Sequence, residues 1–347
     1  MSTVATTDER VKKASFITKA LRRTEVGALL GAIAIFILFT TFDTTGNFAK
    51  LPGIAGWTDI AAPIGIVAIA VALLMIAGEF DLSSGVMVGT TGLFVGVLVS
   101  KLGLNIWVAI LIGLLFAACV GFVNGYLVVK TKLPSFIITL ATFFILKGAN
   151  FALTMIITGS VRVTGVEKAD GYAGAKAVFA STFKVGEQNF QISLLWWLLF
   201  TIVATFMLTR TKFGNWTFAS GGDANAARNA GVPVNRTKIA LFMLTSMASA
   251  LVGIIFVLRL QGMQAGQGVG QEFYYIIAAA VGGTLLTGGA GSAIGASIGA
   301  VIMGMAYIGI PFSLWNSDWT STFLGVILFS AVMINTYIGR KAAGGKR

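Results

Sequence analysis

Apolar runs of about 20 residues recur along this 347-residue chain, and they constrain its fold more than any other feature. A helix needs about that many apolar residues to cross roughly 30 Å of hydrocarbon, because each residue rises about 1.5 Å. Hydrophobic residues make up 56% of the sequence and charged residues only 11%, too little charge to cover a water-soluble domain of this size. The sequence therefore predicts an all-α polytopic membrane protein.

We expect about ten transmembrane helices, and the eighth is short and interrupted by glycine. Such a segment is expected to be broken or re-entrant, which is tolerated where protein shields its backbone. The ten segments are residues 26–42, 59–78, 83–100, 105–129, 134–158, 192–209, 238–258, 274–288, 291–311 and 319–338.

The distribution of lysine and arginine predicts the orientation. Basic residues gather before the first segment, at 130–132, at 210–238 and after the last segment, so the positive-inside rule places both termini in the cytoplasm. Residues 1–25 are then a cytoplasmic tail that no cleavage site follows, and 339–347 are a second cytoplasmic tail. Residues 26–338 form a single transmembrane domain.

Several function classes are disfavoured by composition. The net charge of +12 is explained by the basic loops, and no basic stripe carries stacking aromatics, so nucleic acid is not an expected partner. Histidine is absent and Cys119 is the only cysteine, so we expect no metal site and no internal disulfide. No phosphate-binding glycine motif is complete either. We expect no enzyme activity and no cofactor bound by this chain.

Two loops are too long to be simple connections: 159–191 outside and 210–237 inside. The inner loop contains a helix-compatible stretch from Asp223 to Ala230, with Asp223 as a candidate N-cap and Gly231 and Pro233 as stop signals. A short cytoplasmic helix of this kind is either a docking element or an ordinary surface helix, and local features do not separate the two.

Few polar groups fall inside the predicted spans. Lys147 lies near the middle of the fifth span, where it either lines a pathway or closes an internal polar network. Asn124 and Asn150 are likewise either interhelical hydrogen-bond partners or substrate ligands. No carboxylate falls at the centre of a span, since Glu272 is predicted to precede the eighth; this argues against a proton-coupled transporter.

The remaining acidic residues and the glycines have structural interpretations. Glu79 and Asp81 flank a short inside turn, and Asp81, followed by Ser83, is predicted to cap the third span. The 43 glycines often recur every four residues, which favours close helix packing in lipid. Examples are Gly85 with Gly89, Gly92 with Gly96, Gly121 with Gly125, and the ridge Gly291, Gly295 and Gly299.

Four blocks, in this order, resemble the ribose-type (monosaccharide) permease subunits of ABC importers, in the branched-chain-amino-acid/ribose permease superfamily. They cover residues 60–335 approximately. The blocks are Gly78-Glu-Phe-Asp-Leu-Ser-Ser-Gly85, Asn124-Gly-Tyr-Leu-Val-Val-Lys130 with Leu133-Pro-Ser-Phe-Ile-Ile-Thr-Leu140, Ala219-Ser-Gly-Gly-Asp-Ala-Asn-Ala-Ala-Arg228, and Ala278-Ala-Ala-Val-Gly-Gly-Thr284 with Gly288-Gly-Ala-Gly-Ser292. Asp223 stands where the family usually has Asn, and Lys147 where it usually has Arg.

The resemblance implies a type II-like ABC importer permease fold in the bacterial inner membrane. It implies a second permease copy, a cytoplasmic subunit with two ATP-binding cassettes that holds ATP and Mg, and a periplasmic sugar-binding protein. It also implies that the 210–237 loop couples to the ATPase through Gly221, Gly222, Asp223, Ala226, Ala227, Arg228 and Gly231. The alternative is a secondary transporter or facilitator that works alone.

Overall fold

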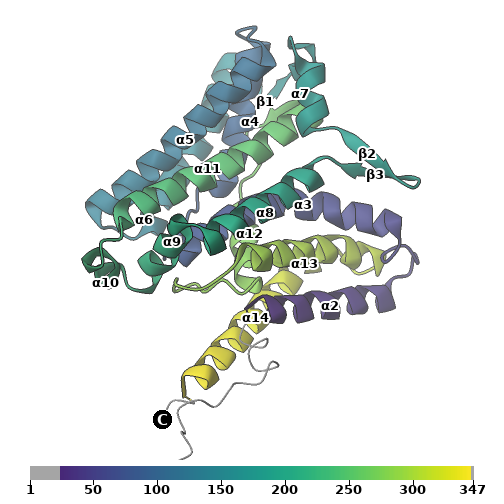
Figure 1. The fold of residues 1–347 in the computed structure, drawn as a ribbon. Coiled ribbons are helices and arrows are strands. Elements are labelled where there is room, and N and C mark those ends of the chain that lie inside the picture. The colour runs from purple at the N-terminus through teal and green to yellow at the C-terminus, as the bar shows by residue number, and fades with distance from the viewer. Residues whose placement is uncertain (1–23, 345–347) are drawn as a thin grey trace, which may run out of the picture.

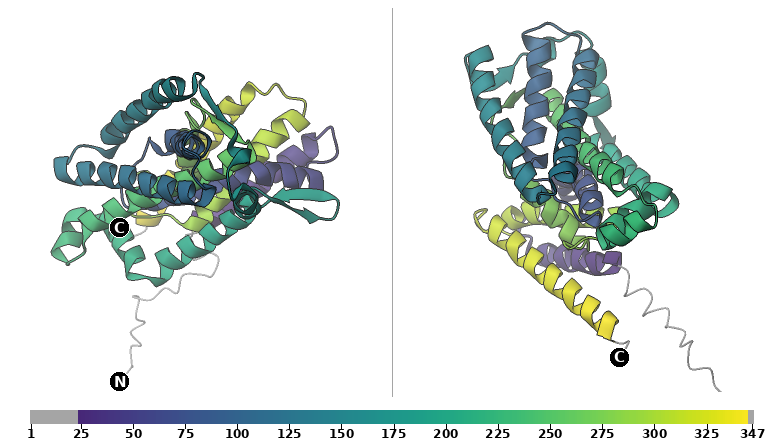
Figure 2. Two further views of the ribbon diagram at one scale, coloured as in Figure 1. Left: turned by 90° about the horizontal axis from the view of Figure 1, so that it is seen from above. Right: turned by 90° about the vertical axis from the view of Figure 1, so that its left-hand side faces the viewer.

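The computed structural model describes residues 24–344, with side chains through residue 333. Its helices form one elongated bundle (Figures 1 and 2). The expected N-terminal tail falls mostly outside the described residues. The helices are α2 (Thr24–Phe42), α3 (Leu51–Ile76), α4 (Ser84–Ser100), α5 (Ile106–Thr131), α6 (Ser135–Thr158), η1 (Val166–Lys168), α7 (Tyr172–Phe179), α8 (Ser193–Arg210), α9 (Lys212–Gly222), α10 (Ala224–Asn229), α11 (Val234–Arg259), α12 (Gln271–Val281), α13 (Ala293–Phe312) and α14 (Trp319–Gly344).

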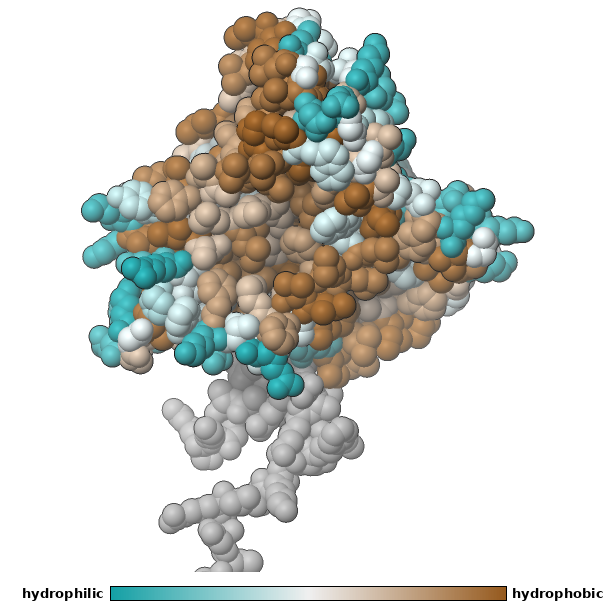
Figure 3. All heavy atoms as spheres, turned by 45° about the horizontal axis from the view of Figure 1, so that its top comes forward, coloured by the Kyte–Doolittle hydropathy of each residue, from teal (hydrophilic) through white to brown (hydrophobic). Residues whose placement is uncertain are grey.

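Seven of these helices are long and apolar enough to cross a membrane: α2, α3, α5, α6, α8, α11 and α13. Two more, α4 and the stretch of α14 up to Met333, are apolar but shorter. Figure 3 shows a broad hydrophobic surface between hydrophilic residues gathered at the two ends of the bundle. Most predicted spans therefore correspond to apolar helices with end shifts of a few residues, and the larger shifts are at α3, which begins at Leu51, at α12 and at the end of α14.

Three helices form the centre of the bundle. The most apolar windows of α3, α11 and α13 are 83%, 78% and 67% buried, whereas those of α5, α6 and α8 are at most 33% buried. The outer helices expose large apolar side chains such as Ile156 (78% exposed) and Ile202 (67%), as expected of lipid-facing positions. Burial thus separates a packed core from a hydrophobic rim.

Glycine lets neighbouring helices of the bundle approach closely. Cβ atoms at Gly121 and Gly125 of α5 would lie 2.6 and 2.8 Å from the Cα atoms of Met243 and Ile239 on α11, closer than real Cβ contacts. The predicted ridge on the ninth span is only partly correct. Gly295 and Gly299 lie on α13 and face α12, but Gly291 precedes the helix in a glycine-rich loop.

The two long loops lie at opposite ends of the bundle (Figure 1). The 159–191 loop is folded: β1 (Arg162–Thr164), η1 and α7 are followed by a hairpin of β2 (Thr182–Val185) and β3 (Gln188–Gln191). Strand β1 pairs antiparallel with β4 (Gly262–Gln264), which follows α11. Over residues 24–344 the fold is therefore mostly helical, with two small two-stranded sheets.

The eighth predicted span differs most from its prediction. Helix α12 has 11 residues, about 16 Å, and is too short to cross a membrane alone. It begins at Gln271 instead of residue 274, and residues 282–292 are a loop, because Gly283, Gly288 and Gly289 have positive φ and end the helix. The last helix continues to Gly344, so the predicted tail from residue 339 is helical at its start.

Candidate functional site

The loop between α8 and α11 folds into two short helices, α9 and α10, at one end of the bundle (Figure 1). Asp223 separates them in an extended conformation, and its Oδ1 accepts hydrogen bonds from the backbone N–H groups of Asn225 (2.9 Å) and Ala226 (3.0 Å). The predicted N-cap is confirmed. A side chain of this kind satisfies amides that the first turn of a helix leaves free.

The end of α10 is equally well defined. Gly231 adopts a left-handed φ of 81°, its N–H donates to the carbonyl of Arg228, and the N–H of Val232 donates to the carbonyl of Ala227. This pair of bonds is a Schellman motif, which glycine favours because it has no Cβ. Local sequence therefore fixes both ends of this six-residue helix.

The expected coupling residues differ in exposure. Gly222, Asp223, Ala226, Arg228 and Gly231 are exposed, and the guanidinium Nη1 of Arg228 donates to Asn225 Oδ1 at 3.0 Å. Ala227 is only 5% exposed, because it faces the body of the protein. The side chain of Ala227 is thus placed to hold α10 in position, whereas that of Ala226 faces outward.

Five glycines join the α9–α10 corner to two other segments; we call them the glycine junction (Gly78, Gly221, Gly222, Gly288 and Gly289). A Cβ at Gly221 would clash with the carbonyl oxygen of Ile76 and lie 2.8 Å from the amide nitrogen of Gly289. A Cβ at Gly288 would lie 2.9 Å from the Cα of Gly78. The corner, the end of α3 and the α12–α13 loop therefore meet backbone to backbone.

The family-signature turn before α4 carries a buried polar network. Asp81 Oδ1 accepts from the backbone N–H (2.8 Å) and the hydroxyl (2.6 Å) of Ser83. Asn124 donates to Ser83 Oγ at 3.0 Å and accepts from the Thr142 hydroxyl at 2.6 Å. Asp81 therefore stabilises the turn through Ser83, which is itself the N-cap residue, rather than capping α4 as predicted.

Asn124 and Asn150 both have internal partners. Asn124 is fully buried, and Asn150 on α6 donates to Thr90 Oγ1 on α4 at 3.1 Å. Of the two interpretations considered for them, this geometry matches interhelical hydrogen bonding.

The structure places two charged residues in or next to the predicted spans, Glu272 and Lys147, as follows. Glu272 lies in the first turn of α12, 3% exposed, packed against Gly85 of α4, and its Oε2 accepts from the amide of Gly270 at 3.0 Å. Lys147 is partly exposed and lies 5.8 Å from the centre of the Phe143 ring. Glu272, predicted to precede the eighth span, therefore lies in the first turn of its helix and not at its centre.

Residues from distant parts of the sequence surround a polar pocket of about 530 Å³ beside α10. Glu79 forms an ion pair with Lys238 of α11 at one wall, and Arg228 and Asn225 come from α10. The remaining lining comes from Val128, Val129, Lys132, Leu133 and Asn235. The turn and the loop of the resemblance thus form one surface at this end of the bundle.

Comparison with known proteins agrees with this arrangement. Residues 53–332 match the family described as "Branched-chain amino acid transport system / permease component". The chain belongs to this family. It is therefore a multi-pass membrane protein of the permease class, as the four sequence blocks predicted. No solved structure matches the chain.

Three relatives from Escherichia coli (strain K12) match over most of their length. The chain is 32% identical to the L-arabinose transport system permease protein AraH over 97% of this chain and 98% of that protein. It is 31% identical to the ribose import permease protein RbsC over 95% of this chain and 98% of that protein. It is 30% identical to the inner membrane ABC transporter permease protein YjfF over 87% of this chain and 89% of that protein. All three names describe transport permeases.

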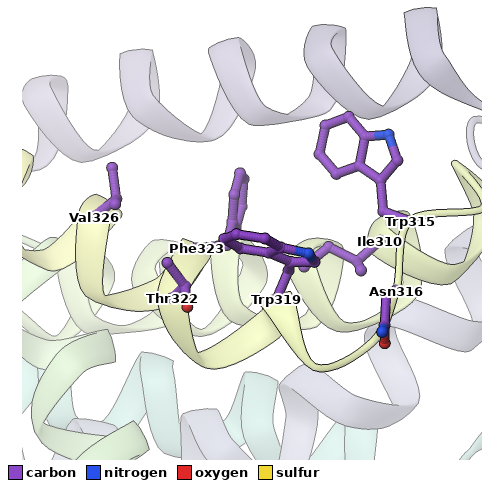
Figure 4. A pocket seen from close by; sticks show the side chains of 7 residues that line it. All are labelled: Ile310, Trp315, Asn316, Trp319, Thr322, Phe323 and Val326. Carbon is purple, nitrogen blue, oxygen red and sulfur yellow. The ribbon is translucent and has the colours of Figure 1, made fainter.

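A second pocket of about 530 Å³ lies where α13 meets α14 in this permease (Figure 4). Trp315 and Phe323 point to one side of it, and Asn316 points to the other. Both aromatic rings pack on Phe39 of α2, at 6.0 and 5.4 Å between centroids. This pocket is therefore part of the aromatic packing between α2 and the last two helices.

Several residues at these sites were missed from sequence. Gly78, Gly288 and Gly289 lie within the family-like blocks, but nothing in the sequence indicates that they contact one another. The glutamines that follow α11 were missed too, although Gln261, Gln264, Gln267 and Gln271 recur every three or four residues among glycines, which is unusual for a membrane span.

Proposed function

We propose that this chain is the membrane-spanning permease subunit of an ABC importer in the bacterial inner membrane. It would translocate a monosaccharide (a pentose, a hexose or a related polyol) into the cytoplasm by alternating access, driven by ATP hydrolysis on a separate subunit. The observation that carries the proposal is the near full-length match to permeases named for L-arabinose and ribose transport.

The α9–α10 corner supports the coupling part of this proposal. A short, well-capped helix with an exposed face at Ala226 and Arg228 is suited to bind a cassette subunit. The glycine junction then offers a direct mechanical route, because the corner touches both the end of α3 and the loop between α12 and α13. Movement of the corner by ATP binding would be transmitted to the centre of the bundle.

The proposal requires three partners: a cytoplasmic subunit with two ATP-binding cassettes, a periplasmic sugar-binding protein, and a second copy of the permease. ATP and Mg would be bound by the cassette subunit. The hydrophilic ends of the bundle support this arrangement, since α9 and α10 lie at one end and the folded 159–191 loop lies at the other (Figures 1 and 3).

A secondary transporter working alone is the second candidate, and one observation favours it. Glu272 is a buried carboxylate in the first turn of α12, and buried ionisable residues occur in some proton-coupled transporters. The two candidates differ in their energy source, which makes them easy to separate.

Reconstituted uptake tests the proposal. The permease is placed in liposomes with its cassette subunit and binding protein, and accumulation of labelled arabinose, ribose, xylose and fructose is measured. We expect accumulation only with ATP and both partners. Accumulation by the permease alone, driven by a proton gradient, would overturn the proposal and establish the second candidate.

A further inference from the structure

The stretch of residues 261–270, which we call the extended segment, joins α11 to α12 without forming a helix; it contains strand β4, and its residues 265–270 are turns. After β4 it runs along one face of α4. A Cβ at Gly92 would lie 2.5 Å from the Met263 methyl group, and one at Gly85 would lie 2.7 Å from the carbonyl oxygen of Gly268. The glycines of α4 therefore make the space in which this segment lies.

Hydrogen bonds to neighbouring helices show how deep the segment lies. Ser83, beside the start of α4, bonds to Asn124, about two turns before α5 ends at Thr131. Thr90 bonds to Asn150, roughly 12 Å along α6 from its end at Thr158. The part of α4 that the segment follows is therefore level with the interior of the long spans.

The side of the extended segment away from α4 is open. Gln264 and Gly266 are exposed, and Gln267 and the adjoining Gln271 are partly exposed. The neighbouring surface comes from α6, where Phe151 lies within 3.3 Å of a Cβ built at Gly266 and Lys147 lies one turn away. The result is a polar face with non-helical backbone, which pairs with β1 of the 159–191 loop at Gln264 and reaches the depth of the hydrocarbon from Gln267 onward.

Such a face cannot meet lipid, because acyl chains offer no hydrogen bonds and each unsatisfied backbone group costs several kcal/mol. At membrane depth, exposed non-helical backbone occurs only where protein buries it or water reaches it. Burial against another subunit would leave three glutamine side chains to be paired there. Contact with water satisfies them directly.

We propose that Gln264, Gln267 and Gln271, with Lys147 and Phe151, line the water-filled path of the transported solute. This inference rests on the proposed function, in which the path would be completed by the second copy. The chemistry suits a neutral, polyhydroxylated solute, because each glutamine amide both donates and accepts hydrogen bonds and the Phe151 ring offers an apolar face to C–H groups. Several individually weak contacts would also allow release.

Cysteine accessibility tests the path without knowledge of the substrate. In a Cys119→Ser background, single cysteines replace Gln264, Gln267 and Gln271, with Ile156→Cys and Ile202→Cys as lipid-facing controls. Each variant is treated with a membrane-impermeant methanethiosulfonate reagent that carries a sulfonate group. The reaction is followed in spheroplasts and in inverted vesicles, with and without ATP. We expect the three glutamine positions to react at least tenfold faster than both controls in one of these conditions. Rates no faster than the controls in all conditions would overturn the proposal.

Uptake by the complete transporter gives a second readout. Gln267→Leu and Gln271→Leu are expected to lower the uptake rate about tenfold at equal membrane expression, and the Asn variants to retain more than half of it. Unchanged uptake in both Leu variants would contradict a lining role. Labelling without ATP needs neither partner nor sugar, so loss of ATP dependence in the uptake assay would count against the proposed function and not against the water-filled path.

Discussion

The backbone N–H of Gly289 donates a 2.8 Å hydrogen bond to the carbonyl oxygen of Ile76, directly beside Gly221. This bond ties the α12–α13 loop to the end of the most buried helix, and the α9–α10 corner rests on both. Because two of the three segments have no side chain at the contact, their separation is set by backbone atoms. A small displacement of the α9–α10 corner is therefore transmitted to the other two segments, because no flexible side chain lies between their backbones.

Gly221→Ala tests this junction. The added Cβ would clash with the Ile76 carbonyl, and overpacking of this kind costs about 1–3 kcal/mol. We expect a lower melting temperature for the purified permease and at least a tenfold loss of ATP-driven uptake. Gly222→Ala is the matched control, since its Cβ meets nothing within 4 Å. Equal melting temperatures for the two variants would contradict the proposed close contact.

The exposed face of α10 can be separated from its buried face. Ala226→Asp is expected to leave the melting temperature unchanged and to abolish co-purification with the cassette subunit, because a charge is added only to the surface proposed to dock. Ala227→Asp is expected to lower the melting temperature as well, since the side chain is buried. If Ala226→Asp binds the cassette subunit normally, α10 is an ordinary surface helix.

The N-cap of α10 predicts a graded result at Asp223. Asp223→Ala removes the acceptor for two backbone amides and should destabilise the helix by about 1 kcal/mol. Asp223→Asn keeps an equivalent acceptor. We expect the uptake rate to fall several-fold in the Ala variant and to stay near wild type in the Asn variant. A similar loss in both would show that charge, and not capping, matters there.

The buried network around Asn124 should behave as a unit. Asn124→Ala removes the amide that donates to Ser83 Oγ and the carbonyl oxygen that accepts from the Thr142 hydroxyl, so we expect a loss of about 1–3 kcal/mol in SDS unfolding. A double-mutant cycle with Thr142→Val should give a coupling energy above about 0.5 kcal/mol. Strict additivity of the two changes would mean that this hydrogen bond contributes nothing.

The spans and the α10 helix were predictable because both depend on local sequence. A membrane-crossing helix needs only a long enough apolar run, and the cap at Asp223 and the stop at Gly231 involve hydrogen bonds within a few residues. The family resemblance rested on the same kind of information, since its blocks are short and contiguous. The exposed and buried faces of the same helix were not predictable, as the position of Ala227 shows.

The sequence by itself determined which segments are apolar enough to enter the membrane and where short helices start and stop. Only the tertiary structure decided what meets at depth: the extended segment against the glycines of α4, Glu272 between the spans, and three distant segments at the glycine junction. The physical reason is that these interactions act over different distances along the chain. Hydropathy and capping act over a few residues of chain, whereas a non-helical backbone inside a membrane is stable only when residues far away in sequence surround it or admit water to it.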